Sequence, residues 1–142
     1  MINEDRTQLI LTADASSTFE KSEFLGTPII ISESPPTLEV FRTRRPLFIR
    51  DVYNNPLTGT IRTMLKKRGT ANLLLAPLLA EDEVIGTVGI DFTEADRVVT
   101  QDDIRLLETI VFQTATAIQK SRLFERIEQS EGDLRALFSA MD

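Results

Sequence analysis

The sequence predicts an α+β fold: a central, mainly antiparallel sheet with short crossing helices and a long C-terminal helix. Two strand-like apolar runs, Leu73–Leu79 and Val84–Phe92, flank a short charged turn, which is typical of an antiparallel hairpin. From about residue 101, apolar residues recur with helical spacing, and no proline or glycine intervenes until Gly132. The 142 residues suffice for one domain, or for one domain with an appended element.

The first quarter of the chain predicts two strands joined by a polar loop. Thr7–Ala13 is a short apolar run between charged or polar residues, and Ile29–Ile31 is a run of three β-branched residues. Between them, the residues of Asp14–Glu23 are mostly polar and small, which indicates a loop. Phe19 is the residue of this loop that we expect to pack into the core.

A helix is predicted to begin after Ser34, because serine caps a first turn well and a proline follows it. The helix has to end near Arg44, since Pro46 disfavours helical backbone in the residue before it. Leu47–Ile49 then predicts a short strand.

The next segment predicts a turn and a second helix. Tyr53–Pro56 has turn composition, and the apolar residues of Leu57–Arg68 lie at helical spacing. The basic run at the end of this helix suits the negative end of the helix dipole, and Gly69 is expected to cap it in the left-handed conformation.

The hairpin contains the strongest strand signals. Leu73–Leu79 is nearly all apolar, which predicts a central strand that is buried on both faces. Gly86 and Gly89 weaken the returning strand, so we expect a close backbone approach or a bulge there.

The long helix is predicted to start at a capping box formed by Thr100 and Asp103. One stripe along it could cover the sheet while a second meets another copy in a parallel two-helix seam; the alternative is one broad core face. We favour core for Ile104–Ile118, and dimer contact or linker for Phe124–Met141. The predicted dimer and linker positions, most of them seven residues apart, are Ile110, Ala117, Phe124, Ile127 and Leu134.

The composition excludes several chemistries. The chain has no Cys and no His, so it has no disulfide, thiolate nucleophile, Ser-His-Asp relay or imidazole ligand for a metal or haem. The acidic turn Glu81–Glu83 and the pair Asp102–Asp103 are better explained as a solvated hairpin tip and as a helix N-terminus than as metal sites. We therefore predict no catalytic residues, no metal and no cofactor.

The net charge and the lengths of the apolar runs limit which partners and which cellular location are expected. The net charge of −6 argues against duplex DNA as the main partner. No run approaches the ~20 apolar residues that a membrane span needs, and the first residues lack the pattern of a signal peptide. A cytoplasmic protein, or a cytoplasmic piece of one, is expected.

The order of these elements resembles that of GAF domains. The resemblance rests on Ala76-Pro77-Leu78 followed by Val84–Ile90, on Arg44–Val52 upstream, and on the stretch from Thr100 into the long helix; it covers residues 7–126. It implies a GAF-like domain over residues 1–126, without the usual N-terminal helix and first strand. Residues 127–142 are then a helical linker, and Glu131–Met141 looks like the truncated start of a PAS domain.

The resemblance implies a regulatory sensory module of a multidomain signalling protein such as a histidine kinase or cyclase, and not an enzyme. It implies a small molecule bound non-covalently between the sheet and the segment that crosses it, a homodimer through the C-terminal helix, and an effector domain in the full-length chain. The absent Cys and His exclude the covalently linked tetrapyrrole, the His-ligated haem and the thiol-reductase branches. The Asn-Lys pair of the cyclic-nucleotide branch is also missing.

The crossing segment supplies the candidate ligand residues, which are Arg50, Tyr53, Thr58 and Arg62. Their side chains could donate hydrogen bonds to an anionic or polar ligand. The alternative is that both arginines are surface charges and that Tyr53 is a partly buried anchor. A rival function is a dimerisation and relay module without a ligand.

Overall fold

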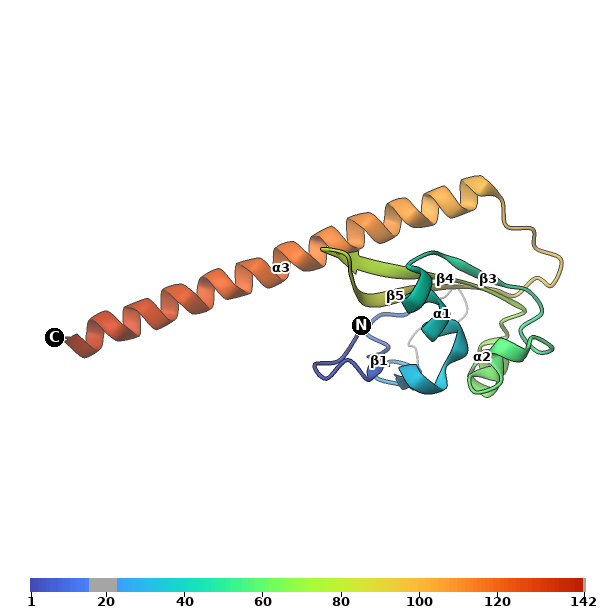
Figure 1. Ribbon diagram of the computed structural model, residues 1–142, viewed down its shortest axis with the longest axis horizontal. Helices are drawn as coiled ribbons and strands as arrows, with labels where there is room; N and C mark the ends of the chain where they lie inside the picture. The colour runs from blue at the N-terminus through green and yellow to red at the C-terminus, as the bar shows by residue number, and fades with distance from the viewer. Residues whose placement is uncertain (16–22, 142) are drawn as a thin grey trace.

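The computed structural model describes residues 1–15 and 23–141, so the prediction for Phe19 lies outside the described residues. It confirms the α+β class, with two antiparallel sheets and three α-helices (Figure 1). The strands are β1 Gln8–Ile10, β2 Pro28–Ile30, β3 Leu47–Ile49, β4 Asn72–Ala80 and β5 Glu83–Phe92. The helices are α1 Pro35–Thr43, α2 Arg62–Arg68 and α3 Gln101–Met141, with 3₁₀ turns η1 Ile31–Glu33 and η2 Pro56–Thr58.

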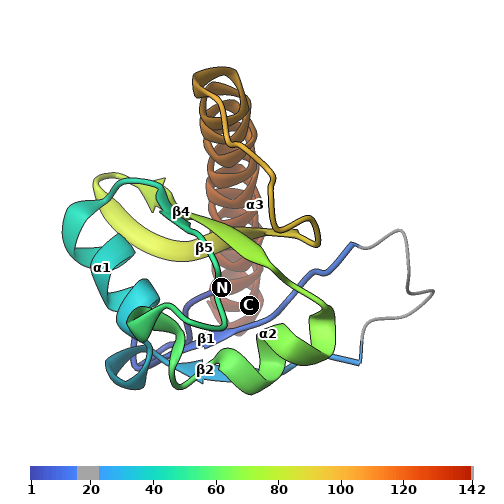
Figure 2. The ribbon, with the colours of Figure 1, turned by 90° about the vertical axis from the view of Figure 1, so that its right-hand side faces the viewer.

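Strand β4 lies at the centre of the β3-β4-β5 sheet and is covered on both faces (Figures 1 and 2). Leu74 packs with Leu107 of α3 on one face, and Leu73 packs with Leu65 of α2 on the other. Because successive side chains of a strand point to opposite faces, this double burial explains the nearly unbroken apolar run in the sequence. The prediction of a central strand buried on both sides is confirmed.

The first three residues join the two sheets. The Ile2 amide donates to the Ile85 carbonyl at 3.0 Å, and the Ile10 amide donates to the Met1 carbonyl at 2.7 Å. Met1–Asn3 therefore lies between β1 and β5, at a position where the sequence predicts no strand.

Two predicted elements need correction. The 57–68 helix is interrupted, because the Asn55 side chain accepts the Leu57 amide and starts the short turn η2, and Ile61 then leaves helical backbone before α2 begins. The predicted strand over Thr7–Ala13 is limited to β1, whose pairing with β2 spans only three residues.

Two predicted helix ends are confirmed, the C-terminus of α2 and the N-terminus of α3. Gly69 caps α2 with a φ of 69°. At the start of α3, the Thr100 amide donates to the Asp103 carboxylate at 2.9 Å and the Asp103 amide donates to the Thr100 hydroxyl at 3.2 Å. The bonds from Thr100 to this carboxylate lower the pKa of Asp103. The helix then runs without interruption across residues 126 and 127, where the sequence places the border of the domain.

The two strand glycines differ in their surroundings, although both lie in β5. A Cβ on Gly86 would lie 3.0 Å from Met1 Sδ and 3.2 Å from Met1 Cα, whereas a Cβ on Gly89 would make ordinary contacts of 3.7 Å. The register of β4 and β5 also shifts between Leu78 and Leu79, opposite this part of β5. The expectation of a close approach or a bulge is confirmed at Gly86, whereas Gly89 shows neither.

We expect Gly86→Ala to lower the free energy of unfolding by about 1–3 kcal/mol, because the added methyl group has to displace the Met1 backbone. Gly89→Ala, the matched control, should change it by less than about 1 kcal/mol. Urea unfolding of both variants measures the difference, and equal stability of the two would contradict the close contact.

Candidate functional site

The segment that leaves β3 forms a tight turn above the start of β4. Asp51 has a positive φ of 47°, and its carbonyl accepts the amides of Asn54 and Asn55 at 3.1 and 3.0 Å. The Asn54 side chain donates to the Asp51 carboxylate at 2.8 Å, and Val52 is fully buried. These contacts hold residues 51–55 in one conformation.

The structure brings two of the four predicted ligand residues together. The Thr58 hydroxyl and the Arg62 guanidinium both donate to the Asn55 carbonyl, at 2.8 and 3.1 Å. The Thr58 hydroxyl also contacts the Val52 carbonyl, and its residue has no exposed surface. Thr58 therefore holds the turn in place, and Arg62 extends from α2 back to the same turn.

The other two predicted residues lie at the surface. Arg50 is exposed, and Tyr53 is 37% exposed. Within residues 1–15 and 23–141, no hydrogen bond or ion pair joins either side chain to Thr58 or Arg62. The four residues thus consist of buried Thr58, half-buried Arg62 and two surface positions along one segment.

Two buried side-chain atoms beside α2 have no partner. Within the described part of the chain, the Arg62 Nε and the Thr70 hydroxyl are buried without a hydrogen bond. Arg62 is half-buried, and none of the described carboxylates forms an ion pair with it. Buried polar groups in proteins are nearly always paired, so the unpaired N–H of a guanidinium that has no ion pair is a feature that a ligand, an ion or a water would satisfy.

A charged cluster that the sequence did not predict lies at the other end of α2. The Arg68 guanidinium donates to both oxygens of Asp14, at 3.0 and 3.1 Å, and to Asp91 of β5. It also lies 5.1 Å from the centre of the Phe24 ring. The two carboxylates raise the pKa of Arg68, the Asp14 hydrogen bonds most of all, and keep the group charged. The cluster connects α2, β5 and the loop after β1.

The sequence does not reveal this cluster, because its members are far apart along the chain. Arg68 is the last of three basic residues, and the sequence alone predicts the same role for all three, a complement to the helix dipole. Lys66 and Lys67 are indeed exposed. Arg68 differs from the two lysines only because the chain turns at Gly69 and the loop after β1 approaches it. Neither feature is visible as a local sequence pattern.

Asn72, the first residue of β4, connects the crossing segment to the approach of α3. Its side-chain oxygen accepts the Asp51 amide at 2.9 Å. Its side-chain nitrogen donates to the carbonyls of Glu94 and Ala95, at 2.8 and 3.2 Å, and the residue is 1% exposed. The linker between β5 and α3 is thereby fixed to the turn that carries the predicted site.

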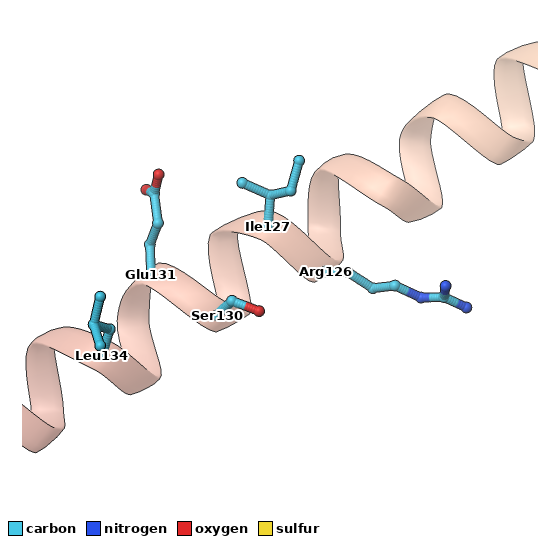
Figure 3. A pocket seen from close by; sticks show the side chains of 5 residues that line it. All are labelled: Arg126, Ile127, Ser130, Glu131 and Leu134. Atoms are coloured by element: carbon cyan, nitrogen blue, oxygen red, sulfur yellow. The ribbon is translucent and has the colours of Figure 1, made fainter.

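Two hollows on the described surface lie elsewhere. One, of about 200 Å³, lies between β4 and α3 and is lined mainly by apolar residues, among them Pro77, Val111 and Phe112. The other is formed by a single helix face and is lined by Arg126, Ile127, Ser130, Glu131 and Leu134 (Figure 3). None of the four predicted ligand residues lines either hollow, whereas Ile127 and Leu134 of the predicted dimer positions line the second.

Helix α3 has two different halves. Leu107 and Ala115 are buried against β4, while every described residue after Lys120 is exposed and the helix projects beyond the sheets (Figure 1). No helix in the described residues is both long and apolar enough to cross a membrane. Among the five predicted dimer positions, Phe124 is 62% exposed and Ile110 is 43% exposed.

Comparisons with known proteins agree on the family and the fold. The family model described as a GAF domain matches residues 1–119. A GAF domain/HD domain protein from Geobacter sulfurreducens is 22% identical with a TM-score of 0.62, over 71% of this chain and 66% of that one. The GAF domain of a two-component sensor histidine kinase from Bacillus halodurans is 18% identical with a TM-score of 0.60, over 70% and 66%.

A third solved structure, of residues 122 to 287 of a methyl-accepting chemotaxis protein, is 19% identical with a TM-score of 0.69, over 87% of this chain and 77% of that one. No curated protein matches the sequence. The chain spans just under two thirds of the first two solved structures. At these identities, the likeness shows the fold.

Proposed function

The chain belongs to the GAF domain family, and from this membership we propose that it is a regulatory sensory module of a signal-transduction protein, with α3 as its output. The observation that carries the proposal is the division of α3, which is one helix of 41 residues. Its first half packs on the central strand and its second half is exposed. A small shift of the sheet face would therefore move the far end of the helix as a rigid rod.

The input that we propose is a small anionic molecule, bound without a covalent bond beside the 50–62 segment. The unpaired Arg62 Nε and the absence of an ion pair from its guanidinium, within the described residues, support an anion. Arg50 and Tyr53 would add donors from the surface side of the same segment. Without Cys or His, the chain offers neither a tetrapyrrole attachment site nor a histidine ligand for haem.

A contiguous set of contacts connects this input to the output. Arg62 contacts the turn at Asn55, the turn bonds Asn72 through the Asp51 amide, and Asn72 bonds the linker that leads into α3. A ligand that pulls Arg62 from Asn55 would disturb the turn and, through Asn72, the start of α3.

The proposal also covers the location, the oligomeric state and the neighbouring domains of the module. We place the chain in the cytoplasm, as a homodimer through α3 and without nucleic-acid partners. The effector domain, a histidine kinase or a cyclase, would belong to the same full-length protein. Residues 127–142 would lead into the following domain, of the PAS type.

The test is a thermal-shift screen of the chain against nucleotides, amino acids and small carboxylate or phosphate metabolites. A specific ligand at 100 times its Kd should stabilise the fold by about 2.7 kcal/mol. We expect Arg62→Gln to abolish the shift caused by an active compound. The matched control Lys67→Gln removes an exposed cation from the same helix and should keep it. A shift that survives Arg62→Gln would contradict the assigned site.

A second candidate function is a dimerisation and relay module without a ligand. The observation that favours it is the use of the Thr58 hydroxyl and one Arg62 nitrogen within the turn itself. If no compound in the screen shifts the melting temperature while the chain dimerises, this second function replaces the first.

A further inference from the structure

The exposed face of α3 carries a continuous stripe of residues at alternating spacings of four and three. Its apolar members lie in both halves of the helix and are all exposed, whereas three members are polar. In Figure 3, Ile127, Glu131 and Leu134 project to the same side of the helix. The stripe consists of Leu106, Ile110, Gln113, Ala117, Lys120, Phe124, Ile127, Glu131, Leu134, Phe138 and Met141.

This stripe has the spacing of a coiled-coil seam and is distinct from the face that packs on the sheet, which carries Leu107, Val111 and Ala115. In proteins most of the stability of a helix comes from packing of one face against other elements, and the exposed half of α3 has no such packing within the described residues. The apolar members predict that another helix covers the stripe.

The charged members decide between the two orientations of a pair of such helices. In a parallel pair, identical positions face each other, so Lys120 would face Lys120 of the second copy and Glu131 would face Glu131. Both layers would bring like charges together inside the seam, where they repel each other.

An antiparallel pair can satisfy both charges at once. In the register that places Phe124 against Ile127 of the second copy, Ala117 faces Leu134, Ile110 faces Met141, and Lys120 faces Glu131. A shift of this register by seven residues would instead place Lys120 against Phe124 or against Phe138. This register also places Gln113 against Phe138. It pairs the two opposite charges and sets every apolar member of the stripe except Leu106 and Phe138 against another apolar residue.

We propose that the partner of the stripe is α3 of a second copy of this chain, packed antiparallel in the register that pairs Lys120 with Glu131 of the other copy. This orientation replaces the parallel seam that the sequence alone suggested. The proposal rests on the homodimer proposed above and adds its orientation. The sheets of the two copies would then lie toward opposite ends of the helix pair, since Leu107–Ala115 is near the start of each helix.

Disulfide trapping tests the orientation cleanly, because the chain contains no Cys of its own. Ala117→Cys and Leu134→Cys proteins of different mass are mixed under subunit exchange and oxidised. The antiparallel register predicts the mixed disulfide. It predicts neither homodisulfide, because equivalent residues would lie about 26 Å apart along the axis, from ~17 residues at 1.5 Å each. Glu125→Cys, off the stripe, is the control that should not cross-link.

Charge exchange tests the register. We expect Lys120→Glu and Glu131→Lys each to weaken dimerisation about tenfold or more in analytical ultracentrifugation, and the double variant to restore it. Glu125→Lys makes the same substitution off the stripe and should leave the Kd unchanged. The dimer of the double variant also rules out misfolding as the cause of the single effects.

The outcomes separate the two proposals. Homodisulfides at both positions, or single variants with an unchanged Kd, would overturn the antiparallel register and leave the homodimer standing. A chain that is monomeric at all concentrations would overturn both.

Discussion

Replacing Asn72 with alanine is expected to lower the free energy of unfolding by about 3 kcal/mol, because this buried side chain makes three hydrogen bonds to the backbone. The substitution leaves the Asp51 amide and the carbonyls of Glu94 and Ala95 without their partner. A hydrogen bond of this kind contributes about 0.5–1.5 kcal/mol, so the loss of all three accounts for the expected effect. Urea-induced unfolding, followed by circular dichroism, measures the loss.

Two further substitutions test whether the hydrogen bonds of Asn72 cause this loss of stability. Asn72→Asp keeps the acceptor for the Asp51 amide but turns a carboxylate oxygen toward two carbonyls, so it should destabilise the chain at least as much as alanine. Asn54→Ala is the matched control, since Asn54 is exposed and its side chain makes one bond, to Asp51. A loss below about 1 kcal/mol for Asn72→Ala would contradict the assigned role.

The second large effect is expected at Arg68, where a methionine substitution should lower the free energy of unfolding by about 2–3 kcal/mol. The reason is electrostatic. Asp14 is 8% exposed and Asp91 is 20% exposed, and without the guanidinium between them two carboxylates would share a poorly hydrated site. The partial exposure of Asp91 keeps the effect below that of a fully buried ion pair.

A double variant separates charge from packing in this cluster. Arg68→Met with Asp91→Asn removes one of the two remaining charges and should be more stable than Arg68→Met alone. Arg42→Met is the control, because Arg42 and Glu39 form an exposed pair whose removal should change the stability by less than about 1 kcal/mol. If Arg68→Met behaves like Arg42→Met, the cluster does not stabilise the fold.

Much of the fold was predictable because its signals are local. Pro35 and Gly69 mark helix ends by their own backbone preferences, and the run around Pro77 predicts a strand whatever lies beside it. The break before α2 is not predictable from local signals. The apolar residues of 57–68 have helical spacing, and the hydrogen bond of the Asn55 side chain that starts a separate turn leaves no pattern in the sequence.

The candidate site was predictable only as a list of donors. The sequence shows that Thr58 and Arg62 can donate hydrogen bonds, but the acceptors they use are backbone carbonyls, which every residue has. The Arg68 cluster was out of reach, because the approach of Asp14 depends on how the loop after β1 packs on α2. Such long-range charge pairs follow from the tertiary fold and leave no spacing pattern.

The joining of the two sheets by Met1–Asn3 has a consequence for the order in which the chain folds. Ile2 and Ile85 pair although about eighty residues separate them, whereas β4 and β5 are joined by a two-residue turn. Local pairings form before distant ones, because closing a long loop costs more entropy. The β4-β5 hairpin should therefore form early, and the β1-β2 hairpin should pack against it late. Under mild denaturant, the β1-β2 hairpin should be the first part of the sheets to unfold.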